Sequence, residues 1–246
     1  MSERIRQAVK AERTSKEYAL NYYKEEADLS PLFRLDTDFL DGIFKRKGKL
    51  FDATMGRGRH VIHFAKKGFE VYGNDYNKSM VDSVRNDLKK LNLKATLYHY
   101  DIQGLSKIKN NSFDYVILMY HSMGSIPKRK NRGIAMKELA RVLKPDGILV
   151  MHAHSIFHDN LKDTLLVLKT YAWHGPDMEP GDEIYFHGKG LGNTFIHYFT
   201  KRELAQMFHS ANLKIIKKAY LNLAQDDYRK GLFKLLSGGF IFVGKK

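Results

Sequence analysis

Two aspartates and a pair of glycines are the residues of this chain whose types and spacing best suit a ligand site. Gly56 and Gly58 follow the apolar run that begins at Leu50, where the chain must turn sharply and let a ligand approach its backbone. Asp52 precedes the turn, and Asp75 lies 23 residues further on, after a second apolar run. A carboxylate at that place accepts hydrogen bonds from ribose hydroxyls in nucleoside-binding βαβ units. The pattern therefore predicts a nucleoside site.

The turn does not match the fingerprint of a dinucleotide site. That fingerprint reads Gly-x-Gly-x-x-Gly and needs a third glycine at position 61, where this chain has Val61. Asp52 would also repel a pyrophosphate, whereas it suits a ligand that carries an amino group or a sulfonium. We therefore expect a nucleoside joined to a positively charged group. The alternative is an ordinary βαβ turn whose glycines bind nothing.

The segments around these residues predict an α/β fold. Short apolar strands are expected at 50–53, 69–72, 94–100, 113–120 and 148–151, with helices between them. Such alternation builds a parallel sheet with helices on both faces. A strand-like run at 195–199, a helix opened by the capping box Thr200–Glu203, and strands beginning at Asn212 and Gly239 are expected to close the sheet.

The glycine turn, Asp52-Ala-Thr54-Met-Gly56-Arg-Gly58, resembles motif I of the class I S-adenosylmethionine-dependent methyltransferases. Thr54 stands where that motif commonly has a glycine, and a similar string occurs in some RNA-directed members. The segment 138–149, with its Pro-Asp-Gly turn, resembles another stretch common to this family. The likeness covers about residues 45–153 and 195–245.

The resemblance implies a Rossmann-like three-layer αβα sandwich. Its sheet would have seven strands, mostly parallel with an antiparallel last strand, and a helical and loop cap would cover it. Residues 1–44 would form an N-terminal helical cap, 45–154 and 195–246 the cofactor-binding core, and 155–194 an inserted substrate-binding cap.

The resemblance also implies which residues hold the cofactor, S-adenosyl-L-methionine. Asp75 would bind the ribose, Asp101 the adenine amino group, and Tyr22 the methionine carboxylate. The full expected set is Asp52, Thr54, Met55, Gly56, Arg57, Gly58, Asp75, Tyr76, Met80, Asp101, Ile102, Met119, Tyr120 and Tyr22. The alternatives are a turn-capping role for Asp101 and core packing for Met80 and Tyr22.

The carboxyl end of the run at 113–120 should face the transferred methyl group, by the switch-point rule for α/β sheets. His121 is the acid–base side chain of that segment, so it is the first candidate for a general base, with His154 and His197 next. The residues expected at the acceptor site are His121, His154, Trp173, His197 and Tyr198.

No metal is expected. His152, His154 and His158 follow the strand at 148–151, and imidazoles so spaced suit zinc or iron. No cysteine or paired carboxylate completes a ligand set, however, so a polar wall of the acceptor pocket is the favoured reading.

Composition narrows the class of protein. The chain has 246 residues, 43% of them hydrophobic, which suits one large domain or a core with an inserted cap. It contains no cysteine, which excludes disulfides and thiolate chemistry. The charged N-terminus lacks the apolar run of a signal peptide, and no stretch reaches the roughly 18 apolar residues of a membrane span. We therefore expect a cytoplasmic protein.

Net charge leaves the acceptor class open. Lys and Arg outnumber Asp and Glu by 42 to 27, and a net charge of +15 can steer a protein to nucleic acid. The basic clusters at 45–49 and 128–132 belong on opposite edges of the sheet, which argues against one continuous groove. We expect methyl transfer to an N, O or C atom of a small molecule by in-line displacement. RNA (tRNA or rRNA) is the alternative acceptor, and a non-catalytic cofactor-binding module is the alternative to an enzyme.

Overall fold

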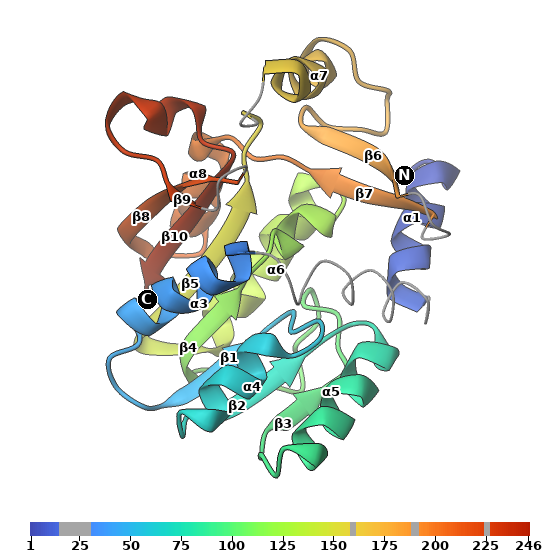
Figure 1. The fold of residues 1–246 in the computed structure, drawn as a ribbon. Helices are drawn as coiled ribbons and strands as arrows, with labels where there is room; N and C mark the ends of the chain where they lie inside the picture. The colour runs from blue at the N-terminus through green and yellow to red at the C-terminus, as the bar shows by residue number, and fades with distance from the viewer. Residues whose placement is uncertain (15–30, 158–160, 188–191, 224–226) are drawn as a thin grey trace.

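A mixed sheet forms the centre of the molecule (Figure 1). The computed structural model describes residues 1–14, 31–157, 161–187, 192–223 and 227–246. The sheet has eight strands in the order β3-β2-β1-β4-β5-β10-β8-β9. Their bounds are β1 Lys49–Asp52, β2 Glu70–Asn74, β3 Thr96–Tyr98, β4 Phe113–Leu118, β5 Leu143–His154, β8 Lys214–Asn222, β9 Asp227–Tyr228 and β10 Gly239–Lys245.

The direction of the strands confirms the expected topology. Strands β1 to β5 pair with one another in parallel. The last strand, β10, lies antiparallel between β5 and β8. β9 is a two-residue strand beyond the seven that the sequence predicts. The central strand β1 buries Leu50 and Phe51, and β4 is mostly apolar, because both faces of the sheet are covered there.

Helices cover both faces, so the predicted three-layer sandwich is confirmed. On one face lie α3 (Pro31–Ile43), α4 (Arg59–Lys66) and α5 (Lys78–Lys90), which bury residues such as Leu40, Phe64 and Val84. On the other face lie α6 (Arg129–Val142) and α8 (Lys201–Ser210), which bury residues such as Leu139 and Phe208. Each helix contributes an apolar stripe to one of two large core clusters.

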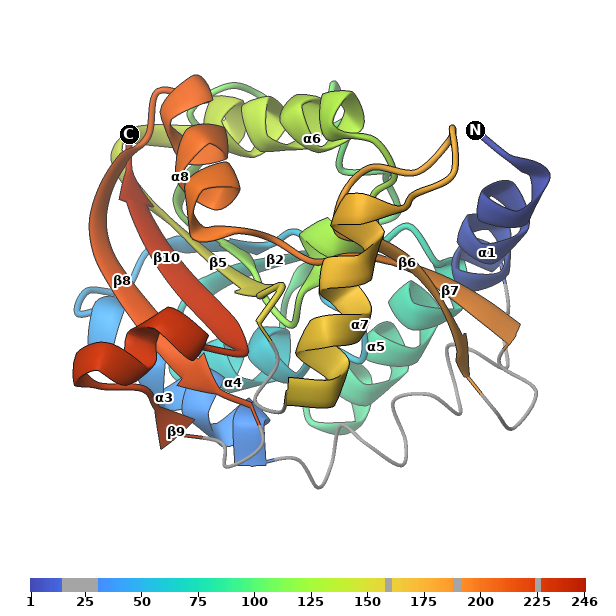
Figure 2. The same ribbon diagram turned by 90° about the horizontal axis from the view of Figure 1, so that it is seen from above.

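A smaller unit stands beside the carboxyl ends of the central strands (Figures 1 and 2). It consists of α1 (Glu3–Thr14), α7 (Leu161–Ala172) and a two-stranded sheet of β6 (Asp182–His187) and β7 (Gly192–His197). Ile5 and Ala8 of α1 pack on Phe195 of β7. Ile156 and Val167 pack with Tyr198 under α7.

One strand prediction was wrong. The run Phe195–Phe199 was expected to help close the central sheet, whereas Phe195 to His197 belong to β7 and pair with β6. An apolar run indicates a strand but not its partner, because strand pairing is decided by contacts far along the chain. The division into core and cap at residues 154 and 195 stays a prediction. Among the described residues, no helix is long and apolar enough to cross a membrane.

Candidate active site

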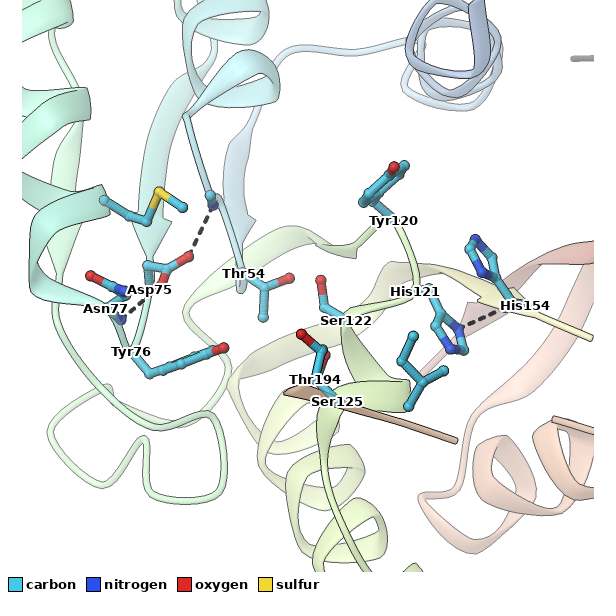
Figure 3. A pocket seen from close by; sticks show the side chains of 13 residues that line it. Thr54, Asp75, Tyr76, Asn77, Tyr120, His121, Ser122, Ser125, His154 and Thr194 are labelled. Carbon is cyan, nitrogen blue, oxygen red and sulfur yellow. Dashed lines mark hydrogen bonds between the residues drawn. The ribbon is translucent and has the colours of Figure 1, made fainter. Parts of the chain in front are cut away.

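A pocket opens at the point where the strand order reverses, between β1 and β4. This is the place where open α/β sheets bind their ligands. In Figure 3, Asp75, Tyr76 and Asn77 lie on one side, His121 and His154 on the other, and Thr54 between them. The lining residues are Thr54, Gly56, Asp75, Tyr76, Asn77, Met80, Tyr120, His121, Ser122, Ser125, His154, Thr194 and Ile196.

The glycine turn is held against the carboxylate of Asp75. Gly56 has a φ of 51°, and its backbone N–H donates to Asp75 Oδ2 at 3.0 Å. The backbone N–H of Asn77 donates to Asp75 Oδ1 at 2.8 Å. Gly58 has a φ of 75°, and a Cβ there would lie 2.7 Å from Val84 Cγ1, so both its backbone and its surroundings require glycine.

The carboxyl group of Asp75 is buried, and its pKa is raised. Burial raises its pKa to about 6, against hydrogen bonds from Asn77 and Gly56 that lower it, and the charge of Asp52 adds to the rise. The two backbone N–H donors therefore do not fully replace the water that the ionised carboxylate has lost on burial. Hydroxyl donors from a bound ribose would supply them, so the site fits a nucleoside.

Buried polar atoms gather behind the glycine turn. Asp52 Oδ2, Thr54 Oγ1 and His60 Nε2 have no hydrogen-bond partner among the described residues. His60 Nδ1 lies 3.7 Å from Asp52 Oδ2, and burial lowers the pKa of His60, followed by the charge of Arg59. Buried polar groups in folded proteins are nearly always satisfied. A ligand end with both donors and acceptors, such as the amino-acid part of S-adenosylmethionine, fits this set.

A second polar cluster, made of Asp36, Arg59 and His152, lies next to the first. Asp36 of α3 lies 3.1 Å from Arg59 Nη2 and 3.4 Å from His152 Nδ1. Burial raises the pKa of Asp36, but His152 and Arg59 more than offset it and hold that pKa below its usual value. Helix α3 is thereby tied to the start of α4, which follows the glycine turn.

On the opposite side of the pocket, the chain after β4 is bent. Tyr120 and His121 both have positive φ, 52° and 62°, which non-glycine residues seldom adopt. Strained backbone of this kind persists where surrounding structure enforces it, often at functional sites. The bend places the His121 ring parallel to that of His154, at 4.3 Å between centroids and 4° between planes, with Tyr198 5.8 Å away.

The hydrogen bonding of His121 fixes its tautomer. The backbone N–H of His154 donates to His121 Nδ1 at 2.8 Å, so Nδ1 is the acceptor and neutral imidazole carries its proton on Nε2. The ring also leaves no room beside Gly124, where a Cβ would come 2.2 Å from His121 Nε2. His121 is therefore arranged as a donor, whereas the sequence predicts a base.

His197 does not line the pocket. It is buried, and its Nδ1 lies 2.7 Å from Asp182 Oδ1 while its Nε2 lies 3.1 Å from Glu203 Oε1. Arg132 joins the cluster, with Nη2 2.9 Å from Glu179 Oε2 and 3.3 Å from Glu203 Oε1. Burial raises the pKa of Glu203, but His197 and Arg132 bring it below its usual value. These ion pairs fasten the β6–β7 hairpin to α6 and α8.

This cluster also has the composition of a metal site. Ligand atoms of Glu179, Asp182 and His197 all lie within 4.8 Å of one another. Both ring nitrogens of His197 already meet carboxylates, and Arg132 is the cation between Glu179 and Glu203. The cluster therefore serves to hold these elements together by ion pairs. We refer to Arg132, Glu179, Asp182, His197 and Glu203 as the ion-pair latch.

The pocket brings together eight of the residues that the sequence predicts for the site, namely Thr54, Gly56, Asp75, Tyr76, Met80, Tyr120, His121 and His154. Asp52 lies behind the pocket wall, and Asp101 accepts from the Gln103 backbone N–H at 3.0 Å. The other predicted residues that lie outside the lining are Met55, Arg57, Gly58, Ile102, Met119, Trp173, His197 and Tyr198. Trp173 is exposed, and Tyr22 lies outside the described residues.

Five lining residues were not singled out from the sequence: Asn77, Ser122, Ser125, Thr194 and Ile196. Asn77 and Ser122 each neighbour a predicted residue, so the switch-point rule could have included them. Thr194 and Ile196 come from β7, and nothing local in the sequence indicates that this hairpin reaches the pocket.

Comparison with known proteins agrees with this geometry. Residues 51–147 match a family model described as a methyltransferase domain. A sugar-nucleotide enzyme of Streptomyces venezuelae, dTDP-3-amino-3,4,6-trideoxy-alpha-D-glucopyranose N,N-dimethyltransferase, is 26% identical over 53% of this chain and 50% of its own length. Glycine/sarcosine N-methyltransferase of Aphanothece halophytica is 30% identical over 55% of this chain and 51% of its own. The chain thus spans about half the length of these curated relatives.

Solved structures share the fold. A SAM-dependent methyltransferase from Methanosarcina mazei superimposes with a TM-score of 0.69 at 21% identity, covering 85% of this chain and 96% of that one. The fold and the switch-point pocket define a Rossmann-like methyltransferase-type domain. Residues 51–147 are thus similar to a methyltransferase domain, and the fold of the chain is that of a solved S-adenosylmethionine-dependent methyltransferase.

Proposed function

We propose that this protein transfers a methyl group from S-adenosyl-L-methionine to a nitrogen atom of a small-molecule acceptor. The observation that carries the proposal is the shared pocket, in which the glycine turn and Asp75 face the paired rings of His121 and His154. The two curated relatives described above, each matched across about half of its length, are named as N-methyltransferases of an amino sugar nucleotide and of glycine or sarcosine. Oxygen and carbon acceptors remain within the class.

The protein would hold the cofactor by its ribose, its adenine and its methionine end. Asp75 would accept from the ribose hydroxyls, with Tyr76 and Met80 beside the adenine. The backbone of Gly56 lets the ligand approach closely. Asp52, whose Oδ2 lacks a partner among the described residues, would face the amino group of the methionine end.

The chain's main contribution to the reaction would be positioning. Bound S-adenosylmethionine would supply the methyl group, which leaves its sulfonium sulfur as the acceptor's lone pair attacks from the opposite side. Holding two reactants in line can contribute about 7–11 kcal/mol to lowering the barrier. The hydroxyls of Ser122, Ser125 and Thr194 line the space between the two halves of the pocket and would orient the acceptor.

An acceptor that arrives as an ammonium ion must lose a proton before transfer, because only the neutral amine has the lone pair that attacks the methyl group. His121 is unsuited to take it at Nε2, because that nitrogen already carries the proton when Nδ1 accepts from the His154 N–H. We therefore assign proton removal to His154 and hydrogen-bond donation to His121. A positioned base of this kind contributes about 10²–10⁴ in rate. His154→Gln should shift or abolish the acidic limb of the pH–rate profile, because that limb reports protonation of the base, whereas His121→Asn should lower kcat without moving it.

A small acceptor fits better than RNA. The cluster at 45–49 precedes β1 and so lies at the end of the sheet away from the pocket. On the pocket side, Arg132 is buried and paired with Glu179 and Glu203. An acceptor screen with methyl-labelled cofactor, small amines and cellular RNA tests the proposal. Label in small amines supports it; label in RNA, with steep loss of activity in salt, favours the RNA alternative. Cofactor binding with no transfer to any acceptor favours a binding module.

A further inference from the structure

Two short elements of this protein expose large apolar side chains. Helix α7 and the adjoining turn expose Leu161, Leu165, Leu166 and Trp173, and the 3₁₀ helix η3 (Gly231–Leu236) exposes Leu232, Phe233 and Leu236. Trp173 is 90% exposed, Leu232 84% and Leu161 73%. Single exposed leucines are ordinary, but clusters of this size on a monomer mark interaction sites.

The exposed face of α7 is separate from the face that holds the helix in place. Val167 is buried and packs with Ile156 and Tyr198, so the helix already has its core contact. Leu166 and Trp173 stand on the far side at helical spacing from one another. The surface helix of a globular protein normally exposes polar side chains opposite its buried face. The exposed leucines of α7 therefore contribute nothing to its packing on the rest of the protein.

Both elements lie at the same end of the molecule. In Figure 1, α7 and the segment after β9 stand at the top, where β5 ends, and the view from above in Figure 2 shows both toward the reader. This is the end of the sheet at which the pocket lies, since His154 is the last residue of β5 and lines it. A partner on this surface would meet the protein beside its active site.

Basic residues are interspersed with the apolar ones. The stretches 161–174 and 228–237 together contain five Lys or Arg and one acidic residue, Asp163. Lys162 and Lys169 are exposed on α7, and Lys230 and Lys234 are exposed at η3. A second copy of the chain would bring like charges together, and RNA would leave the leucines without contacts. An anionic lipid surface satisfies both the apolar and the basic side chains.

We propose that this α7–η3 surface, comprising the apolar side chains and the four lysines named above, docks on the interface of an anionic lipid membrane. The leucines and Phe233 would enter the boundary between headgroups and acyl chains, and Trp173 would lie at headgroup depth. The lysines would contact lipid phosphates. The protein would lie on the membrane with its pocket near the lipid, which goes beyond the proposed methyl transfer and does not depend on it.

Vesicle binding of the intact chain tests this proposal directly. Trp173 is the only tryptophan, so its fluorescence reports on this surface alone. Vesicles of phosphatidylcholine with phosphatidylglycerol should shift its emission to shorter wavelength and carry the protein down on sedimentation, whereas pure phosphatidylcholine should do so far less. Salt should weaken the binding, because it screens the lysines.

The variant Leu232→Ser/Phe233→Ser should reduce the partition coefficient about tenfold or more, given that burial of each large apolar side chain is lost. Lys230→Gln/Lys234→Gln should reduce it on anionic vesicles only. The matched control is Leu91→Ser, an exposed leucine that follows α5 at the other end of the sheet, and it should bind like the wild type. Thermal unfolding of each variant checks that the fold is retained.

Equal sedimentation with and without vesicles would overturn the proposal. So would a dimer in solution that the Leu232→Ser/Phe233→Ser change dissolves, because the surface would then join two copies of the chain. Binding that the control variant loses to the same extent would show nonspecific adsorption and would overturn it too.

Discussion

The affinity for S-adenosylhomocysteine should weaken about tenfold between pH 7 and pH 5, because Asp75 takes up a proton over that range. Burial, opposed by the N–H groups of Asn77 and Gly56 and reinforced by Asp52, raises the pKa of Asp75 to about 6. The ribose hydroxyls of a bound nucleoside would donate to the ionised carboxylate. The protonated form must donate a proton of its own and so loses an acceptor position.

The magnitude follows from the fraction of protein that is competent to bind. When only the ionised form binds, the dissociation constant is multiplied by 1 + 10^(pKa − pH). With a pKa of about 6 for Asp75, this factor is about 11 at pH 5 and about 1.1 at pH 7. Isothermal titration at half-unit intervals should therefore show about tenfold weakening from pH 7 to pH 5, with a nearly constant affinity above pH 6 and a steady decline below it.

In the ligand-free protein, ionisation of Asp75 should have the opposite effect: it should lower the stability as the pH rises. The folded-state pKa of Asp75, about 6, lies well above the ordinary aspartate value of 3.8. At about 1.4 kcal/mol per unit, the proton contributes about 3 kcal/mol to the unfolding free energy, fully present below pH 3.8 and lost as the pH rises through 6. Urea unfolding measures the free energy of unfolding of the wild type and of Asp75→Asn. The wild-type value minus the Asp75→Asn value should fall by about this amount between pH 4 and pH 7.

Asp75→Asn and an exposed control make the experiment decisive. Asp75→Asn should bind the ligand weakly at every pH, since its amide offers one acceptor oxygen and a donor that faces a backbone N–H. Asp38→Asn, on the exposed side of α3, should keep the wild-type pH dependence. An affinity that does not change from pH 5 to pH 7 in the wild type would refute the placement of ribose on Asp75.

Two further predictions concern the acceptor side and the cap. Gly124→Ala places a methyl group 2.2 Å from His121 Nε2, so it should displace the stacked rings and lower kcat/KM at least about tenfold, with cofactor affinity within a few-fold of wild type; unchanged kinetics would show that the rings are dispensable. Arg132→Met removes the buried cation that Glu179 and Glu203 share in the latch and should cost about 3–5 kcal/mol of unfolding free energy, measured in urea. Arg34→Met, at an exposed ion pair, is the matched control and should not change it measurably; an equal effect at both sites would contradict the latch.

The cofactor half of the site could be predicted from sequence because its determinants are local. The turn from Asp52 to Gly58 is a continuous string, and Asp75 follows at a spacing set by one helix and two strands. Short apolar runs separated by amphipathic helices then determine the layers of the fold. The structure places Thr54, Gly56 and Asp75 together in the pocket accordingly.

The acceptor half could not be predicted, because it depends on how distant segments pack. His197 was a candidate base, but Asp182 and Glu203 enclose its ring in the latch. Trp173 was a candidate pocket wall, yet the packing of α7 turns it to the outside. Thr194 reaches the pocket only because β7 pairs with β6 instead of joining the central sheet. Side-chain type alone does not distinguish these outcomes.

Direct titration of the wild-type protein with S-adenosylhomocysteine tests the central claim that the switch-point pocket is a methyltransferase cofactor site. The account predicts one-to-one binding at pH 7.5, with a dissociation constant on the order of micromolar, and marked weakening in Asp75→Asn. Absence of detectable binding at millimolar ligand, or equal affinity in wild type and Asp75→Asn, would contradict it.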